Sequence, residues 1–359
     1  MKQRDLVQNA KYPQGISELR RPIESPASIV DASGKVNFGT FLEPIERLNI
    51  IEAKCPINKV FTKFINSQRI KEWEAFEISF DEGFVVGAIY DVGIMYFNVI
   101  IFYDKRTNKV KSNQYIKFGT KKVVKDSLCG TIADNQIDGF NICIKNSFKE
   151  GKCCVFANCP KSKKGVDMWV NCELNSIAQP SVAVMPLGEN RPLYSQKELF
   201  SVKGSIVIDG EEFTMNENTL AIIDDHKGYY PFKMHYDWIT GLGRVDGKVV
   251  GFNLTANQVV DKYNYNENYL WLDGDMHPLP DIKIQKVDKN RWICKDEFDM
   301  VNIEFNIKES FYKTVGTKNI GADYRAPFGY ISGYIKDIFG NKVNIENMFG
   351  MGEDKSYQI

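Results

Sequence analysis

The chain has 359 residues, a length that accommodates one large domain or two domains of about 150 residues each. Its 46 Lys and Arg residues balance 46 Asp and Glu residues, and this zero formal net charge argues against nucleic acid or an acidic membrane surface as a partner. A hydrophobic content of 43%, with 13% aromatic residues, excludes a disordered protein. The chain has three histidines, His226, His235 and His277.

The N-terminal segment is predicted to be an extended arm. Residues 1–10 include Lys2, Arg4 and Asp5 and contain no apolar stretch, so we expect no signal peptide there and a cytoplasmic protein. Pro13, Pro22 and Pro26 punctuate the first forty residues and favour an extended or wrapping segment over a helix.

The next segments carry strand patterns. Phe76, Ile78 and Phe80 alternate with polar residues, which predicts a strand with one buried face. The apolar stretch Gly83–Tyr103 has the length of a membrane span, but it is rich in Val, Ile, Phe and Tyr and is interrupted by Asp91-Val92-Gly93. We therefore predict two strands joined by a turn, and no membrane span.

The eight cysteines are predicted to be reduced thiols, because no export signal precedes them. Six of them lie between residues 129 and 172, where a zinc site has to be considered. The spacing Cys153-Cys154-x4-Cys159 lacks the C-x2-C knuckles of structural zinc sites, and no histidine is near. Small buried residues in strands are the better interpretation.

Turn signals define the predicted architecture. Hairpins are predicted at four Asp-Gly dipeptides, because a type I′ turn needs positive φ at both central residues: Asp138-Gly139, Asp209-Gly210, Asp246-Gly247 and Asp273-Gly274. Helical periodicity is scarce; Tyr194–Val202 is predicted as a short helix, and Asn58–Ile70 fits either a helix or a strand. The predicted fold class is all-β, with two antiparallel barrels or sandwiches packed together and few short helices.

A proline-containing connection sets the predicted domain boundary. Ala178–Pro192 carries three prolines and little periodicity, so we expect it to join two strand-rich halves. The expected domains are residues 1–187, including the N-terminal arm, and residues 188–359, which carry the candidate site.

The sequence contains no complete nucleotide-binding or serine-hydrolase motif. In Gly241-Leu-Gly243-Arg-Val-Asp-Gly247, Asp246 stands where the dinucleotide fingerprint has its third glycine, and the segment is a predicted hairpin without a following helix. The sequence has no Walker loop and no G-x-S-x-G elbow. These observations set aside a classical NAD enzyme, an NTPase and a serine hydrolase, and we expect no cofactor.

The segment Ile222–Leu279 holds all three histidines among carboxylates and aromatic rings. Apolar walls raise a carboxyl pKa toward neutrality, so this mixture suits general acid–base chemistry. On a strand, His235 and Asp237 face one side and Tyr236 and Trp238 the other. Asp225-His226 precedes Lys227-Gly228, which we predict to be a turn.

Each candidate also has a structural interpretation. His235 and Asp237 fit a surface ion pair, His226 and His277 fit loop hydrogen bonding, and Asp273 fits turn geometry alone. The catalytic candidates are His226, Asp237, His235 and Asp225. The ligand-binding candidates are Trp238, Tyr236, Tyr230, Asn253, Glu267, Asn268, Trp271, Asp273 and His277. No H-x-H or H-x3-H spacing supports a metal site, and none is predicted.

Several motifs together resemble a bacterial family called domain of unknown function 2804. They are Asp225-His226-Lys227-Gly228-Tyr229-Tyr230-Pro231-Phe232, Asp237-Trp238, Gly251-Phe252-Asn253-Leu254, Glu267-Asn268, Leu272-Asp273-Gly274 and Met348-Phe349-Gly350-Met351-Gly352-Glu353-Asp354, with Leu19-Arg20-Arg21-Pro22-Ile23 and Lys71-Glu72-Trp73 nearer the N-terminus. The resemblance covers nearly the whole chain.

That family is distantly similar to two-barrel, lipocalin-like (calycin) proteins, which include the carotenoid hydratases, AttH-like proteins and fungal cyclases. The likeness implies a lipocalin-like fold and a site near an Asp-His turn and a Trp-Asp-Trp strand. Asp225-His226 fits the first motif. Asp237-Trp238 fits the second, although Tyr236 replaces its leading tryptophan, and Gly228 stands where the relatives often have an aromatic residue.

The primary hypothesis is a protein that binds an apolar small molecule, such as a terpenoid, lipid or polyketide. His226 and Asp237, helped by His235, would transfer protons to or from a carbon–carbon double bond, as in a hydratase, isomerase or cyclase. One alternative is a carrier or sensor of a hydrophobic ligand without chemistry. A second is a carbohydrate-active protein with paired carboxylates across a cleft.

Overall fold

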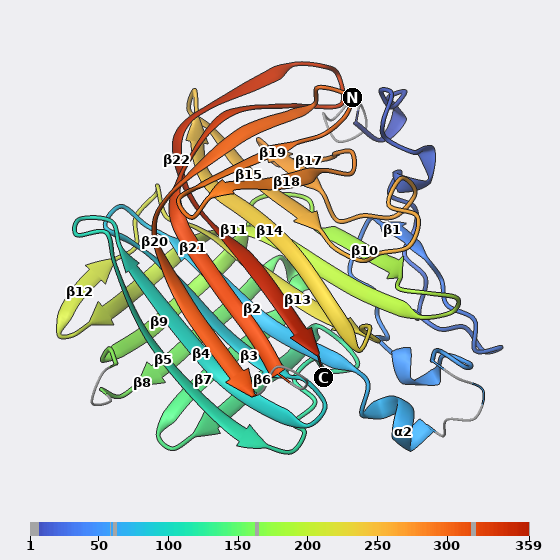
Figure 1. Ribbon diagram of the computed structural model, residues 1–359, viewed down its shortest axis with the longest axis horizontal. Helices are drawn as coiled ribbons and strands as arrows, with labels where there is room; N and C mark the ends of the chain where they lie inside the picture. Colours follow the sequence, from blue (N-terminus) through green and yellow to red (C-terminus); the bar gives the residue numbers. More distant parts are fainter. Residues whose placement is uncertain (1–6, 58, 60–62, 162–164, 317–320, 359) are drawn as a thin grey trace. The chain divides into compact units, whose positions relative to one another are not determined.

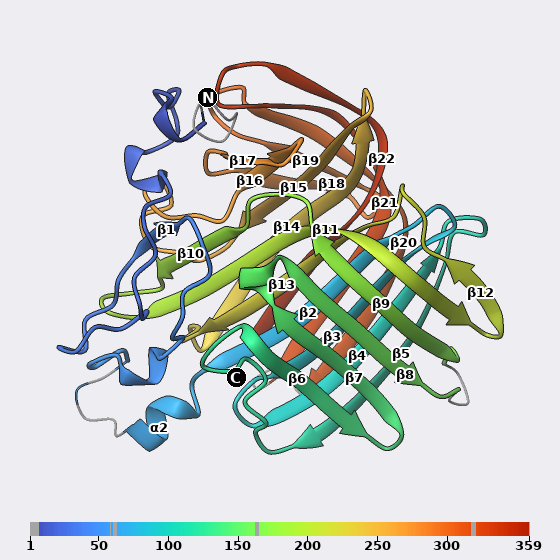
Figure 2. The ribbon, with the colours of Figure 1, turned by 180° about the vertical axis from the view of Figure 1, so that it is seen from behind.

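The computed structural model describes residues 7–57, 59, 63–161, 165–316 and 321–358. The chain divides into two compact units, here called the larger unit, Glu24–Tyr230, and the smaller unit, which combines Met1–Ile23 with Pro231–Ile359. Both are built from antiparallel strands (Figures 1 and 2).

The larger unit contains one 13-stranded sheet. Its elements are β1 (Gly39–Phe41), η2 (Ile50–Glu52), α2 (Lys63–Ser67), β2 (Lys71–Ser79), β3 (Gly83–Asp91), β4 (Met95–Asp104), β5 (Lys109–Phe118), β6 (Cys129–Ile137), β7 (Phe140–Ser147), η3 (Phe148–Glu150), β8 (Lys152–Cys159), β9 (Met168–Ser176), β10 (Ser181–Pro186), β11 (Pro192–Ile208), β12 (Glu211–Thr214) and β13 (Leu220–Gly228). The main strand order is β5-β4-β3-β2-β13-β11-β9-β8-β7-β6. Figure 1 shows β2 to β5 side by side, and Figure 2 shows β6 and β7 beside β8 and β9.

This sheet curls until its two ends meet. Asn98 on β4 donates to the backbone oxygen of Asn135 on β6 at 2.9 Å, and Asn135 donates back to the Asn98 side chain at 2.8 Å. The interior is filled by apolar side chains from strands on both halves of the sheet, among them Phe76 on β2, Phe200 on β11 and Phe140 on β7. The result is a barrel-like sheet around one apolar core.

The smaller unit contains a nine-stranded sheet with the order β17-β16-β15-β14-β22-β21-β20-β19-β18. Its elements are η1 (Glu18–Arg20), β14 (Lys233–Val245), β15 (Lys248–Ala256), β16 (Tyr269–Leu272), β17 (Asp275–Pro278), β18 (Lys283–Asp288), β19 (Arg291–Lys295), β20 (Val301–Gly316), β21 (Gly321–Lys336) and β22 (Lys342–Gln358). The sheet curls around a core that includes Ile239, Phe252, Trp292 and Phe305, with Tyr12 and Ile16 of the N-terminal segment.

The structure confirms the all-β prediction and its turn chemistry. Asp138, Asp209, Asp246 and Asp273 all have positive φ, and each joins two paired strands. The segment Gly83–Tyr103 forms β3 and β4, as predicted. Among the described residues, no helix is long and apolar enough to cross a membrane.

Four of the eight cysteines are small buried residues in strands, as expected, whereas Cys55 and Cys154 are exposed and Cys129 and Cys143 are intermediate. All eight are free thiols, and Cys153, Cys159, Cys172 and Cys294 are buried in strands. Burial raises the pKa of the Cys159 thiol to about 11, so this thiol is protonated at neutral pH.

Two local predictions were wrong. Tyr194–Val202 is part of the 17-residue strand β11, not a helix; its helix-forming residues are overridden by pairing with β9, β10 and β13. The strand predicted around Phe76 and Ile78 is β2, which ends at Ser79 and is buried on both faces, as Glu77 at 2% exposed shows. The polar residues that alternate with Phe76 and Ile78 therefore do not face solvent.

The expected linker and boundary differ from what is observed. Ala178–Pro192 contains β10, which pairs with β11 of the same sheet, so the expected boundary at 187/188 falls inside a hairpin. The compact units divide at residues 230/231 instead, and residues 7–23 belong with the smaller unit. Within Asn58–Ile70 the described part contains α2; residues 58 and 60–62, like residues 1–6, lie outside the described residues.

A glycine in β11 generates a stability prediction. At Gly204 (φ +126°), β11 passes from its pairing with β13 to its pairing with β12, and an added Cβ would lie 2.1 Å from the backbone oxygen of Asn171. We expect Gly204→Ala to lower the free energy of unfolding by ~3 kcal/mol or more, measured by urea denaturation. Gly210→Ala is the control, because it has positive φ but no atom within 4 Å of the added Cβ; its expected loss is ~1 kcal/mol. Equal losses would contradict the steric argument.

Candidate functional site

A buried polar network surrounds His226 in the larger unit. The pairing register places His226 on β13 directly between Ser195 on β11 and Trp73 on β2. Its Nε2 lies 2.9 Å from Ser195 Oγ and 2.7 Å from Lys197 Nζ, and its Nδ1 lies 3.0 Å from Tyr230 OH. Both ring nitrogens therefore contact side chains that can donate or accept a proton. The imidazole is 5% exposed.

An ion pair anchors this network. Lys197 Nζ lies 3.0 Å from Asp224 Oδ1, and the two residues are register partners on β11 and β13. The same carboxylate oxygen lies 3.3 Å from His226 Nε2. Because both members of the pair are buried, each compensates a charge that would otherwise be costly to remove from water.

Aromatic rings and a backbone clamp fix the geometry. The Trp73 ring stacks on the His226 ring with centroids 4.5 Å apart and planes 9° apart, and it stacks on Tyr230 at 5.6 Å. Tyr230 follows the end of β13, and Arg191 donates to the backbone oxygens of Tyr229 and Tyr230. The Tyr230 hydroxyl is therefore held against an imidazole that is itself stacked on Trp73.

Asp225 lies on the opposite face of β13 from His226. It points into the barrel beside its register partners Glu74 and Gln196. Burial, together with repulsion from Glu74, raises the Asp225 pKa well above its ordinary value. Burial also raises the pKa of Glu74 to about 8, although Asn146 donates to its carboxylate. Neither oxygen of Asp225 has a hydrogen-bond partner among the described residues.

These carboxyls form a polar layer in the larger unit's interior. Glu198, another side chain of this layer, has its pKa raised to about 7 by burial. Protonation below the raised pKa removes the charge and so reduces the cost of burying the group. Asp225 and His226 are thus neighbours in sequence but belong to different environments.

His235 and Asp237 form a second cluster, in the smaller unit. His235 Nε2 lies 3.4 Å from Asp237 Oδ2, and its Nδ1 lies 2.9 Å from Ser356 Oγ. Lys286 Nζ contacts Asp237 and Asp354 at 2.6 Å each. The two acids and His235 have ligand atoms close enough for a metal ion, but the Lys286 ammonium already forms an ion pair with both carboxylates. A cation would have to displace it.

Amide side chains organise the other face of β14. Trp238 Nε1 donates to Asn253 Oδ1 at 2.6 Å, and Asn253 in turn donates to Thr255 and to the backbone oxygen of Glu267. Asn268 accepts from the backbone of Thr255 at 2.6 Å and donates to Pro280 at 3.0 Å. These hydrogen bonds of Trp238, Asn253 and Asn268 therefore join parts of the protein to one another.

Tyr236 belongs to the same face. Its hydroxyl donates to one oxygen of Glu353 at 2.6 Å, and Tyr324 donates to the other oxygen at 2.6 Å. Two phenols thus hold one buried carboxylate. Glu267 accepts from Asn257 at 3.0 Å.

The remaining candidates, Trp271, Asp273 and His277, lie in the core or in a turn. Trp271 is fully buried, and Asp273 occupies the turn between β16 and β17. His277 is 2% exposed, and burial lowers its pKa to about 4, so it is neutral at neutral pH. Its ring packs edge-on against Phe339.

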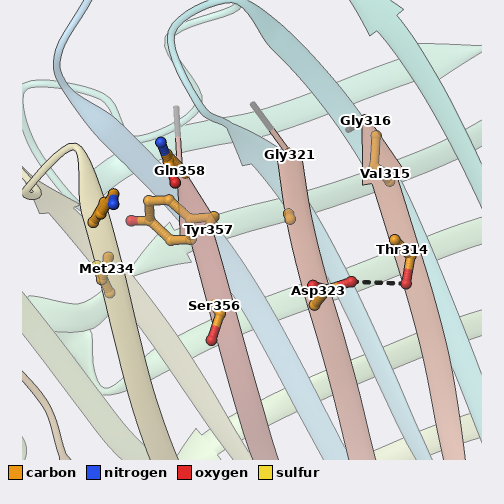
Figure 3. Close-up of a pocket in the computed structure, with 11 residues that line it drawn as sticks. Met234, Thr314, Val315, Gly316, Gly321, Asp323, Ser356, Tyr357 and Gln358 are labelled. Carbon is orange, nitrogen blue, oxygen red and sulfur yellow. Dashed lines mark hydrogen bonds between the residues drawn. The ribbon is translucent and has the colours of Figure 1, made fainter. Parts of the chain in front are cut away.

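A shallow pocket of about 440 Å³ lies at the ends of β14, β20, β21 and β22 (Figure 3). Figure 3 labels Met234, Tyr357 and Asp323 among its lining, and Thr314 donates to Asp323 at 2.8 Å. None of the predicted site residues is among its lining residues.

The structure thus divides the predicted catalytic residues. His226 and Asp225 lie in the larger unit, on opposite faces of one strand, whereas His235 and Asp237 lie in the smaller unit. Lys227-Gly228 continues β13 and is not a turn. Sequence reasoning did not single out Ser195 or Lys197, and it named Trp73 only as part of a family motif. Strand alternation across Tyr194–Val202 would have placed Ser195 and Lys197 on one face.

The raised pKa of Glu198 predicts a pH dependence of stability. The folded-state pKa of about 7 exceeds the ordinary value of 4.5, so the stabilisation is complete below about pH 4.5 and is lost as the pH rises through 7. Glu198→Gln should therefore gain stability relative to the parent between pH 5 and pH 8, by ~3 kcal/mol at most. Urea denaturation at both pH values measures it, with exposed Glu24→Gln as the control. Parallel pH profiles for the parent and Glu198→Gln would refute the assignment.

Comparison with solved structures supports the fold assignment. CghA, determined with Sch210972, superimposes with a TM-score of 0.55 at 10% identity, covering 93% of this chain and 97% of that chain. Kievitone hydratase from Nectria haematococca superimposes with a TM-score of 0.50 at 11% identity, covering 80% and 88%. These likenesses concern the fold and confirm the predicted lipocalin-like, all-β class.

No curated protein sequence matches the chain. A family model described as "Domain of unknown function (DUF2804)" matches residues 20–358. The chain therefore belongs to the DUF2804 family, in agreement with the resemblance carried by its Asp-His and Asp-Trp motifs.

Proposed function

We propose that this protein binds an apolar small molecule and transfers a proton to or from a carbon–carbon double bond of that molecule at the network around His226. One observation carries the proposal: a buried imidazole contacts a potential proton donor or acceptor at each ring nitrogen and lies flat on a tryptophan. The residues proposed to act there are His226, Tyr230, Lys197 and Asp224.

The chemistry follows from burial and charge. Hydrogen bonds and charges act more strongly where water is excluded, so an enclosed network can move a proton without a metal or an organic cofactor. Positioned acid–base groups contribute about 10²–10⁴-fold to a rate. The Trp73 ring stacks on both His226 and Tyr230 and so holds the imidazole and the phenol in a fixed geometry for proton transfer.

The comparisons support the same class of activity. Kievitone hydratase is by name an enzyme that adds water to its substrate, and CghA was determined with a small molecule bound. A hydratase, isomerase or cyclase acting on a terpenoid, lipid or polyketide therefore fits both the network and the fold.

The other predicted catalytic residues receive different roles. Asp225 faces the interior of the barrel, away from His226, and is proposed to contribute only to the polar layer there. Asp237 and His235 belong to the ion-pair cluster with Lys286 in the smaller unit, and the proposal gives them no part in the proton transfer.

A histidine comparison tests this function. The protein is incubated in H₂¹⁸O with a panel of acyclic terpenoids, unsaturated lipids and polyketide polyenes, and mass spectrometry detects products that have gained labelled water or rearranged without mass change. We expect His226→Gln to lower the rate by at least about 10²-fold, because it removes a group that bonds to both Lys197 and Tyr230. His235→Gln, in the half-exposed cluster, is the matched control and should leave the rate nearly unchanged.

Two outcomes would contradict the proposal. An equal loss in both variants would show that His226 has no special role. The second outcome combines two results: no panel member is converted, and native mass spectrometry of protein purified from its own host shows a retained apolar ligand. That outcome would favour the non-catalytic carrier.

A further inference from the structure

The positions of the hydrogens around His226 follow from its partners. Lys197 forms an ion pair with Asp224 at 3.0 Å, so its amine is an ammonium group, which has donors and no acceptor. At 2.7 Å from this ammonium, His226 Nε2 must offer its lone pair. A neutral imidazole with an unprotonated Nε2 carries its hydrogen on Nδ1.

The second contact then has a fixed direction. His226 Nδ1–H donates to Tyr230 OH at 3.0 Å, so the phenol oxygen accepts at the imidazole. The phenol's own proton is consequently directed away from His226. Without Lys197, the Asp224 oxygen 3.3 Å from Nε2 would be the nearest anionic acceptor and would favour the opposite tautomer, with Nε2–H donating to Asp224.

We infer that Tyr230 is the catalytic residue that delivers and recovers the proton, and that Lys197 and His226 are positioning residues that fix the direction of this transfer. The inference rests on the proposed function and specifies which group touches the double bond. The order Asp224–Lys197–His226–Tyr230 forms a continuous chain of contacts from the anion to the phenol.

In a hydration, Tyr230 gives its proton to the alkene and recovers one from water. The Tyr230 O–H bond breaks and a C–H bond forms at one alkene carbon with the π electrons, which leaves a cation at the other carbon. Water forms a C–O bond to that carbon, and its surplus proton returns to the Tyr230 phenolate. During the step, the phenolate accepts from His226 Nδ1–H, whose Nε2 accepts from the Lys197 ammonium, so negative charge on Tyr230 is stabilised through the imidazole.

The tautomer is measurable without any substrate. Protein labelled with ¹⁵N-histidine has three imidazole rings, because the chain contains His226, His235 and His277 only. Long-range ¹H–¹⁵N spectra distinguish a protonated from an unprotonated nitrogen in each ring, and His235→Gln and His277→Gln assign the signals. We expect His226 in the folded protein to be protonated at Nδ1 and unprotonated at Nε2.

Two variants separate the roles. Lys197→Met should move the His226 proton to Nε2. Tyr230→Phe, which removes one hydroxyl, should keep the proton on Nδ1 and yet lower turnover of a panel substrate by at least 10²-fold. If Lys197→Met does not fold, the parent and Tyr230→Phe spectra still decide the question.

The outcomes distinguish this inference from the proposed function. A parent spectrum with His226 protonated at Nε2, or Tyr230→Phe turning over at the parental rate, would overturn the inference while leaving proton transfer at His226 intact. Failure of the parent to convert any panel member would overturn the proposed function, and with it the catalytic role of Tyr230, but would leave the tautomer assignment to stand on its spectra.

Discussion

The arrangement of this molecule depends on one constraint: the central strands β2, β13 and β11 are buried on both faces over most of their length. A strand in that position cannot place charged residues against solvent. The charges of β13 must therefore be neutralised by a partner or by a proton. Asp224 takes the first route, through Lys197 on the paired strand, and Asp225 takes the second, through a raised pKa inside the barrel.

The same constraint gives the two faces of β13 different chemistry. On one face, Trp73, His226 and Ser195 lie side by side across three strands. The pairing register of these strands therefore brings an indole, an imidazole and a hydroxyl together. On the other face, Glu74, Asp225 and Gln196 occupy the equivalent positions. Because side chains alternate along a strand, a shift of one residue in the register would exchange the two sets. The register of β13 is thus as important to the site as the identity of its residues.

Much of the fold could be predicted from local signals. The Asp-Gly dipeptides each mark a hairpin, since their φ requirement is met by few other residues, and Asp91-Val92-Gly93 divides β3 from β4. Burial on both faces could not be predicted, because an alternation of polar and apolar residues is the same for a solvated strand. Glu77 and Lys197 look like surface residues in the sequence and are buried in the fold.

The site was predictable only in part, because the sequence does not show which strands pair or which polar residues are buried. His226 and Tyr230 were found from their dense polar and aromatic surroundings. Lys197 was missed because Tyr194–Val202 carries helix formers, and its true neighbour, Asp224, is supplied by a strand that follows later in the chain. Because His226 and Asp237 are close in the sequence, the prediction placed them in one site. They belong to different units, which divide between residues 230 and 231.

The closure of the larger unit has a mechanical consequence. Of its described strands, β5 pairs along its length with β4 and β6 pairs with β7, and where no continuous ladder is formed, the amides of Asn98 on β4 and Asn135 on β6 bond to each other. A ladder of several backbone bonds must break cooperatively, whereas this seam is closed by a few side-chain bonds of about 1 kcal/mol each. Local opening with the rest of the sheet intact costs least there. Amide exchange along β5 and β6 should therefore be faster than in β2 and β13.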